Sequence, residues 1–230
     1  MTQPGKTIGI LMTGHAVPEV LEALGDYDAM FARLLDGHGF NFKSYDCEGG
    51  VIPASPDECD GWLITGSKHG VYEDHAWIPP LEAFIRDVYA AGVPLIGVCF
   101  GHQIIAQALG GKVVKYDGGW SIGHTSYEIE GETRSLNAWH QDQVVELPEG
   151  AEVVGSSDFC SNAALVYGEH VYTIQPHPEF TSDMIDFLLK YRGKGVVPDE
   201  ILQAAATRLH APTQSPAIAD RMAEVLKRGA

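Results

Sequence analysis

The chain has 230 residues, of which 45% are hydrophobic, so it is long enough to bury the core of one ordinary globular domain. Its formal net charge is −16 and it has only 15 lysines and arginines, which argues against nucleic acid as a partner, because phosphate binding requires clustered basic side chains. No basic segment precedes an apolar run near the N-terminus and no apolar stretch is long enough to cross a bilayer, so we expect a cytoplasmic protein without membrane partners.

The first hundred residues alternate between predicted strands and helices. Short apolar runs predict strands over residues 6–13, 40–46, 61–65 and 93–98. Apolar residues at helical spacing predict helices over residues 26–37 and 80–91, and the first has an aspartate cap and a glycine stop. This order predicts a parallel sheet covered by helices on both faces, with ligands bound at the carboxyl ends of the strands.

The pattern changes between residues 112 and 175, where short alternating stretches are separated by glycine, proline and aspartate. The stretches at residues 125–129, 143–147 and 163–167 predict antiparallel additions to one edge of the sheet. Helical spacing returns after Thr181, which is the predicted N-cap of a helix that ends at residue 191. Two further helices are predicted over residues 199–209 and 215–227. We therefore expect an α/β domain over residues 1–194 and a C-terminal helical extension over residues 195–230 packed on it.

The four cysteines show neither CxxC nor any other metal-binding spacing, and they are Cys47, Cys59, Cys99 and Cys160. We expect them to be reduced thiols, and we predict no metal site and no cofactor. Cys99 differs from the others because it lies between an apolar strand and a helix. A side chain at such a corner is exposed to ligands, and the unpaired N–H groups of the helix stabilise a thiolate there. The alternative is a small buried hydrophobic residue.

A second cluster supplies the groups that a nucleophilic cysteine needs. A predicted strand over residues 171–174 is followed by His177-Pro178-Glu179, and the proline fixes the backbone between a base and a carboxylate. His177 would take the proton of Cys99, and Glu179 would hold the histidine in one tautomer and orientation. The alternative for Glu179 is a surface carboxylate beside a turn.

The stretch GVCFGHQ around Cys99, followed downstream by a strand and HPE, resembles the class I glutamine amidotransferases. In that family the corresponding cysteine, histidine and glutamate form the triad that hydrolyses the γ-amide of glutamine. The resemblance therefore implies catalytic roles for Cys99, His177 and Glu179. It also implies a three-layer, flavodoxin-like α/β fold with a mostly parallel sheet, and it covers residues 6–192.

The resemblance also implies donors for the oxyanion that forms during amide hydrolysis. One donor would come from Gly66-Ser67, after the third predicted strand, and the other from Phe100, the residue that follows the nucleophile. The family has Gly-Gly at the first position, and a serine restricts the backbone there, so the identity of that donor stays open. A plain loop is the alternative for Gly66 and Ser67.

Four further residues are implied to contact the substrate. The glutamine of the family's CxGxQ motif touches the amino-acid portion of the substrate and corresponds to Gln103, for which a solvent-facing helical glutamine is the alternative. The segment WHQD resembles a loop that closes around the substrate's α-amino and α-carboxylate groups, which implicates Trp139, His140 and Gln141. His140 is an alternative base, but it lacks the adjacent orienting carboxylate that His177 has.

The sequence around the triad, including ITGSKHGVYEDHAWI at residues 64–78, resembles that of the free-standing members of the family, such as γ-glutamyl peptidases. We expect cysteine-dependent hydrolysis of a small γ-glutamyl amide, either glutamine or a γ-glutamyl peptide, through a γ-glutamyl thioester. One alternative is a glutaminase subunit that delivers ammonia to a separate synthetase chain. Another is a binding module without turnover, which an intact triad disfavours. Tyr72 and Trp77 are either pocket-lining or core residues.

Overall fold

The computed structural model describes residues 5–228, and its centre is a nine-stranded sheet with the strand order β2-β1-β3-β4-β11-β10-β9-β6-β7. The parallel strands are β1 (Thr7–Met12), β2 (Asn41–Asp46), β3 (Gly61–Ile64), β4 (Leu95–Val98) and β11 (Val171–Ile174). The antiparallel strands at one edge are β6 (Ser121–Ile129), β7 (Glu132–His140), β9 (Ala151–Ser156) and β10 (Ala164–Tyr167). The prediction of a parallel sheet with antiparallel additions at one edge is confirmed for residues 125–129 and 163–167. It is wrong for residues 143–147, which correspond to β8 (Asp142–Glu146), because this strand pairs with β5 (Lys112–Lys115) in a separate two-stranded sheet.

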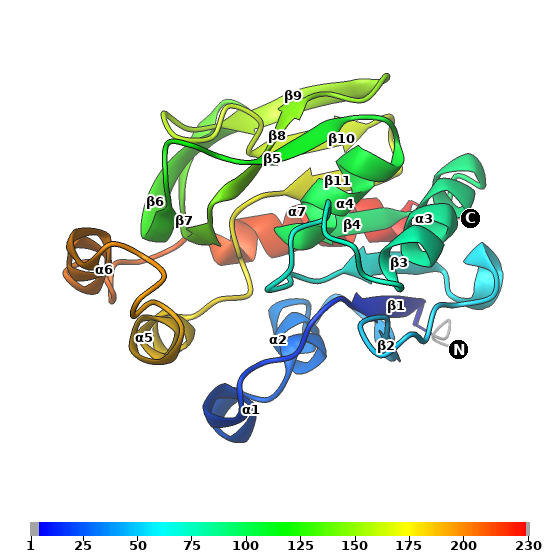
Figure 1. Cartoon of the computed structure of the whole chain (residues 1–230). Coiled ribbons are helices and arrows are strands. Elements are labelled where there is room, and N and C mark those ends of the chain that lie inside the picture. Colours follow the sequence, from blue (N-terminus) through cyan, green and yellow to red (C-terminus); the bar gives the residue numbers. More distant parts are fainter. Residues whose placement is uncertain (1–4, 229–230) are drawn as a thin grey trace.

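Helices cover both faces of the parallel strands (Figure 1). The helices on one face are α3 (Ile78–Ala90) and α4 (Phe100–Ala108), and those on the other are α2 (Tyr27–Leu34) and α7 (Ser215–Lys227). Every residue of β3, β4 and β11 is buried, as expected for parallel strands with a helical layer on each side. The result is the three-layer, flavodoxin-like arrangement that the resemblance implied.

The C-terminal helix α7 belongs to one of these layers. Six of its residues are buried against β1, β3, β4 and β11, and they are Ile218, Ala219, Met222, Ala223, Val225 and Leu226. Burial of this apolar face stabilises the fold, since each fully buried aliphatic side chain contributes about 1.5–3 kcal/mol. A boundary between residues 194 and 195 stays a prediction.

The remaining elements lie around this centre. They are the helices α1 (Pro18–Leu24), α5 (Ser182–Tyr191) and α6 (Asp199–Ala206), the 3-10 helix η1 (Pro56–Glu58), and a two-stranded sheet of β5 (Lys112–Lys115) and β8 (Asp142–Glu146). The predicted caps are confirmed, because Asp26 accepts from the Tyr27 N–H and Thr181 from the Met184 N–H. The predicted helix over residues 26–37 ends earlier, at Leu34. No helix of the described residues is long and apolar enough to span a membrane.

The carboxyl ends of four adjacent parallel strands meet at one edge of the sheet. Thr13 follows β1, Thr65 follows β3, Cys99 follows β4, and the segment that leads to His177 follows β11. A close approach of α4 to the sheet defines the corner after β4, because a Cβ on Gly101 would lie only 2.3 Å from the Ile64 carbonyl oxygen. Ligands of such sheets bind at this edge.

Candidate active site

Cys99 occupies the corner between β4 and α4 in a strained conformation. Its φ of 53° and ψ of −104° lie in a region of backbone angles where residues other than glycine are rarely found. Such a conformation costs of the order of 1–3 kcal/mol and is typical of functional sites. The surrounding backbone holds it, because the Cys99 N–H donates to the Ile174 carbonyl at 2.9 Å and the Cys99 carbonyl accepts from Gln103 N at 3.1 Å. The side chain is buried from bulk solvent but lines a cavity.

His177 and Glu179 form a buried pair beside Cys99. The distance between His177 Nδ1 and Glu179 Oε1 is 2.6 Å. The carboxylate is the acceptor, so Nδ1 carries the proton and Nε2 is the ring nitrogen left for Cys99. Burial lowers the pKa of His177, but the negative charges of Glu179 and Cys99 and hydrogen bonds to both outweigh burial and raise it to about 10. The arrangement favours the imidazolium form of His177 beside the Cys99 side chain.

Two residues that the sequence analysis did not identify hold His177 in place. The His177 N–H donates to the Asn137 carbonyl at 2.8 Å, and Asn137 Nδ2 donates to the Phe180 carbonyl at 2.8 Å. The rings of His177 and Phe180 stack with centroids 3.9 Å apart and an interplanar angle of 2°. Phe180 directly follows the HPE motif and so carries a local signal, whereas the pairing with Asn137 on β7 is not visible in the sequence.

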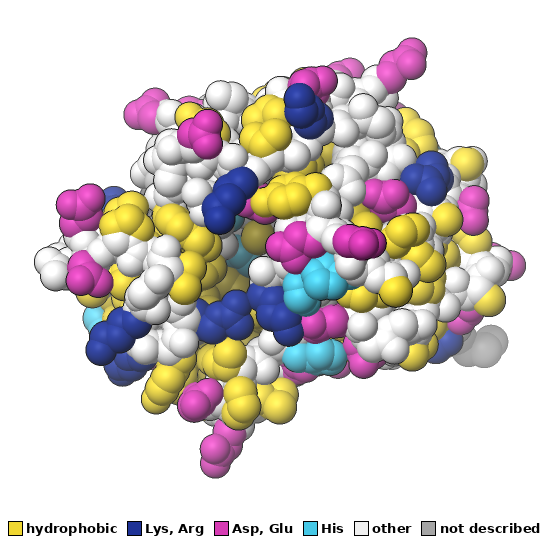
Figure 2. All heavy atoms as spheres, viewed as in Figure 1, with side chains coloured by type: hydrophobic (Ala, Val, Ile, Leu, Met, Phe, Trp, Pro, Cys, Tyr) yellow, Lys and Arg dark blue, Asp and Glu magenta, His cyan; other side chains and the backbone are white. Residues whose placement is uncertain are grey.

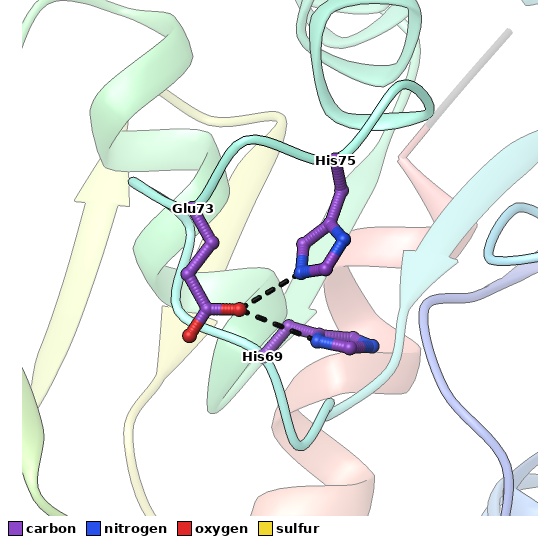
Figure 3. A group of neighbouring side chains, drawn as sticks. All are labelled: His69, Glu73 and His75. Carbon is purple, nitrogen blue, oxygen red and sulfur yellow. Dashed lines mark hydrogen bonds and ion pairs between the residues drawn. The ribbon is translucent and has the colours of Figure 1, made fainter.

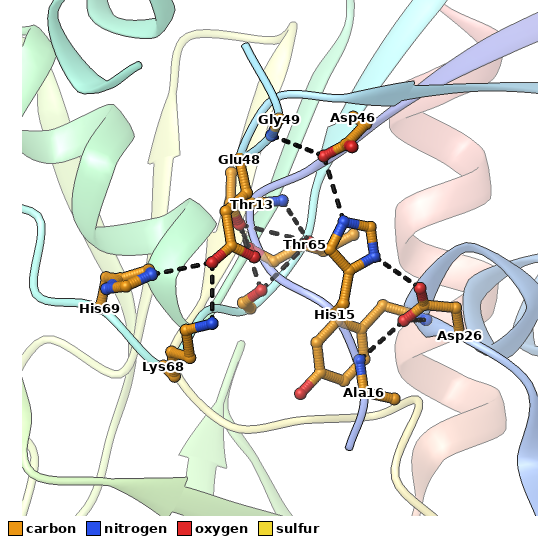
Figure 4. Close-up of polar contacts among 12 residues, drawn as sticks. Thr13, His15, Ala16, Asp26, Asp46, Glu48, Gly49, Thr65, Lys68 and His69 are labelled. Carbon is orange, nitrogen blue, oxygen red and sulfur yellow. Dashed lines mark hydrogen bonds and ion pairs between the residues drawn. The ribbon is translucent and has the colours of Figure 1, made fainter. Parts of the chain in front are cut away.

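The turn after β3 is fixed by two buried threonines (Figure 4). The Gly66 carbonyl accepts from Thr13 Oγ1 and from Thr65 Oγ1, each at 3.1 Å. Because the peptide bond is trans, the N–H of Ser67 points the opposite way from the Gly66 carbonyl. A side chain at position 66 would crowd the His177 ring, since a Cβ there would lie 3.0 Å from His177 Cε1 and the ring would have to shift by a few tenths of an ångström.

Three backbone donors are available beside Cys99. The residues Gly66, Ser67 and Phe100 all line the cavity. Within the part of the chain that the structure describes, none of their N–H groups makes a hydrogen bond. Free N–H groups next to a nucleophile at a helix N-terminus are suited to stabilising a developing oxyanion.

The residues predicted to contact substrate also line the cavity, but some of their polar groups are already used. Gln103 Nε2 donates to the Asp142 carbonyl at 2.9 Å and to Gln175 Oε1 at 3.0 Å, which leaves only its own Oε1 for a ligand. Gln141 Nε2 donates to the Tyr116 carbonyl at 3.2 Å. Trp139, which is half-buried, also lines the cavity.

His140 differs from His177 in its electrostatics. Burial lowers the pKa of His140 to about 3, opposed by a hydrogen bond with the Asp142 backbone, so the ring stays neutral. Its Nδ1 lies 3.2 Å from the Asp142 carbonyl oxygen and donates to it. The buried Nε2 has no hydrogen-bond partner among the described residues. A neutral ring with one free acceptor is better suited to binding than to proton transfer at neutral pH.

The cavity has a volume of about 300 Å³ and brings together all the predicted site residues except Glu179, which lies behind His177. Its apolar lining includes Val17 and Val20 at the start of α1 and Met184 and Leu188 of α5. Tyr72 lines the cavity and its hydroxyl donates to Asp142 Oδ2 at 2.9 Å. Trp77 is instead a core residue packed on the Phe100 ring, with centroids 5.5 Å apart.

Basic side chains border this cavity although the chain is strongly acidic. Lys68, Lys115 and Arg192 contribute to its wall, and Figure 2 shows lysine and arginine side chains beside the hollow on this face. Lys68 forms an ion pair with Glu48 at 2.8 Å. Lys115 and Arg192 form no salt bridge within the described residues, so their charges are available to an anionic ligand.

Comparisons with known proteins point to one family. A family model described as "Glutamine amidotransferase class-I" matches residues 41–187. A glutamine amidotransferase-like protein of Schizosaccharomyces pombe is 29% identical over 90% of this chain and 93% of its own length. Gamma-glutamyl peptidase 3 of Arabidopsis thaliana is 29% identical over 72% of this chain and 74% of its own length.

Two further comparisons concern larger proteins and the fold. A glutamine-hydrolyzing GMP synthase of Caldicellulosiruptor saccharolyticus is 31% identical over 72% of this chain, and the match spans 33% of the synthase. The crystal structure of a glutamine amido transferase from Methylobacillus flagellatus superposes with a TM-score of 0.73, at 24% identity, over 98% of this chain and 93% of that one. At this identity the structural match shows a common fold.

Proposed function

Since the chain belongs to the class I glutamine amidotransferase family, we propose that it hydrolyses a γ-glutamyl amide bond with Cys99 as the nucleophile. The observation that carries this proposal is the strained Cys99 corner beside the buried His177–Glu179 pair. Cys99 and His177 also line one cavity together with three unpaired backbone N–H groups.

In the proposed mechanism, the Cys99 thiolate attacks the γ-carbonyl carbon. The oxyanion is stabilised by the N–H of Phe100 and by that of Gly66 or Ser67. The His177 imidazolium gives its Nε2 proton to the leaving amine, and a γ-glutamyl thioester remains on Cys99. His177 then takes a proton from water, whose oxygen attacks the thioester and releases the γ-glutamyl group as a free carboxylate. Glu179 keeps the Nδ1–H of His177 oriented throughout.

We propose a γ-glutamyl peptide as the preferred substrate. Compared with glutamine, such a peptide has additional surface and an additional carboxylate on the leaving-group side. The unpaired cations Lys115 and Arg192 and the exposed ring of Tyr72 in the cavity wall suit those additions. A second candidate is a glutaminase that passes ammonia to a synthetase chain, which the similarity to part of a GMP synthase favours.

The isolated protein is expected to show a kcat/KM at least about tenfold higher for a γ-glutamyl dipeptide than for glutamine. This ratio requires only about 1.4 kcal/mol of added transition-state binding. Steady-state kinetics with both substrates measures it. Equal or higher activity on glutamine, or activity that appears only when a synthetase is added, would support the glutaminase alternative.

Two variants identify the source of this preference. Arg192→Gln is expected to reduce the dipeptide preference and leave glutamine hydrolysis nearly unchanged. Arg208→Gln, which alters an exposed arginine outside the cavity, is the matched control and should change neither rate. An equal loss on both substrates would assign Arg192 to the shared γ-glutamyl portion.

A further inference from the structure

The loop between β3 and α3 carries two histidines and a glutamate whose side chains meet. Glu73 Oε2 lies 3.4 Å from His69 Nδ1 and 2.8 Å from His75 Nε2. The three atoms all lie within 4.8 Å of one another, and Figure 3 shows both rings turned toward the Glu73 carboxylate. We propose that His69, Glu73 and His75 form a binding site for a divalent transition-metal ion, with Zn²⁺ as the best fit.

The hydrogen bonding of His69 supports this site independently. His69 Nε2 lies 2.9 Å from Glu48 Oε1, and because a carboxylate oxygen only accepts, Nε2 carries the proton. In the neutral ring, Nδ1 then has a lone pair that faces a second carboxylate, that of Glu73. The Nδ1 lone pair and the Glu73 oxygen are both acceptors, and a cation between them would stabilise the pair. A histidine that binds a metal through one nitrogen commonly donates from the other to a carboxylate.

The charge around the cluster also suits a cation. Lys68 Nζ lies 2.8 Å from the same oxygen of Glu48 (Figure 4). Lys68 therefore balances the negative charge of Glu48. The negative charge of Glu73, which contacts the two histidines, is not balanced by a lysine or arginine among the described residues. With neutral rings, the five side chains carry a net charge of about −1.

The geometry requires small shifts and the loss of one proton. Without metal, His75 Nε2 donates to Glu73 Oε2 at 2.8 Å, so zinc must displace that proton and the neutral ring then keeps its proton on Nδ1. Ligand atoms about 2.1 Å from a tetrahedral ion are separated by roughly 3.4 Å, so the observed spacing needs shifts below about 1 Å. Aromatic packing holds the rings, because the His69 and His75 centroids are 4.1 Å apart and His75 stacks on the buried Trp77 at an angle of 18°. Two imidazoles and one carboxylate favour zinc over calcium or magnesium, which prefer oxygen ligands.

The site would lie in the wall of the substrate cavity. His69 and Glu73 line the same cavity as Cys99, and the loop that carries them begins with Gly66-Ser67. Three protein ligands leave a coordination position open for water or another donor. The proposal does not depend on the chemistry at Cys99, so it can be tested in a chain that lacks that thiol.

The test is calorimetric titration of the chelator-treated 230-residue Cys99→Ser chain with zinc chloride. The serine variant excludes zinc binding by the thiol of Cys99 together with His177. We expect one equivalent of zinc to bind. Adding His75→Gln is expected to weaken binding at least about 100-fold. Adding Glu48→Gln, which removes the carboxylate partner of His69 and Lys68 but no proposed ligand, is expected to weaken it about 10- to 100-fold. His170→Gln, at an exposed histidine outside the cluster, is the matched control and should bind zinc as before.

Two further measurements guard against misfolding and nonspecific binding. The unfolding temperature of each variant without metal reports whether it is folded, and Glu73→Gln replaces His75→Gln if the latter is destabilised. The d–d absorption of bound Co²⁺ should be present in the Cys99→Ser protein and absent after loss of His75 or Glu73. The proposal would be overturned if the Cys99→Ser protein binds no zinc. It would also be overturned if zinc binding is unchanged by His75→Gln and by Glu73→Gln.

Discussion

Replacing His177 with asparagine is expected to lower kcat on any γ-glutamyl substrate by about 10²- to 10⁴-fold, because the group that activates Cys99 and protonates the leaving amine is lost. The raised pKa of His177 and its 2.6 Å contact with Glu179 make it the residue equipped for both proton transfers. Steady-state kinetics on purified protein with a γ-glutamyl dipeptide measures the effect.

His140→Asn is the matched control for this substitution. His140 lines the same cavity but is kept neutral and has no carboxylate partner, so its loss should chiefly raise KM. Circular dichroism and the unfolding temperature check that both variants are folded. A larger loss of kcat in His140→Asn than in His177→Asn would mean that the base has been assigned to the wrong histidine.

Glu179→Gln is expected to lower kcat/KM by about 10²- to 10⁴-fold and to shift its pH dependence, because an amide neither fixes the His177 tautomer nor stabilises the imidazolium. A pKa of about 10 keeps His177 protonated across neutral pH, so kcat/KM should fall only as the pH rises through about 10. Without the charge of Glu179 the pKa of His177 falls, and this alkaline decline should move to lower pH.

Measurement of kcat/KM from pH 5 to 11 for both proteins tests this expectation. Glu169→Gln, at an exposed carboxylate, is the control and should leave the pH profile unchanged. If the alkaline decline of Glu179→Gln coincides with that of the wild type, the proposed coupling between Glu179 and His177 is wrong.

The parallel centre of the fold could be predicted because each of its elements has a strong local signal. Apolar runs identify strands that are buried on both faces, and the caps Asp26 and Thr181 identify helix starts. Elements with weak local signals were missed. The helix α1 has a single buried residue, Val20, and β7, whose sequence is ETRSLNAWH, begins with four polar residues that show no alternation.

The candidate site likewise has a part that could be predicted from local sequence and a part that could not. The Cys99 corner and the His177-Pro178-Glu179 segment are contiguous motifs, so their residue types and order are readable in the sequence. Contacts that join distant segments are not readable. Asn137 meets His177 only because this part of β7 pairs with the segment that follows β11, and Arg192 reaches the cavity only because α5 packs beside α1. The metal-binding proposal also depends on how one loop folds, since its ligand spacing matches no pattern considered in the sequence.

The central claim is that Cys99 is the nucleophile, and labelling with a glutamine-like chloroketone followed by peptide mapping tests it most directly. Burial raises the pKa of both Cys47 and Cys160 to about 12 and also raises that of Cys59, so these thiols should stay protonated and react slowly. Cys99 faces the cavity beside His177. We predict one label per chain, on Cys99, before any other cysteine reacts. Labelling of another cysteine first, with Cys99 unmodified, would contradict the account.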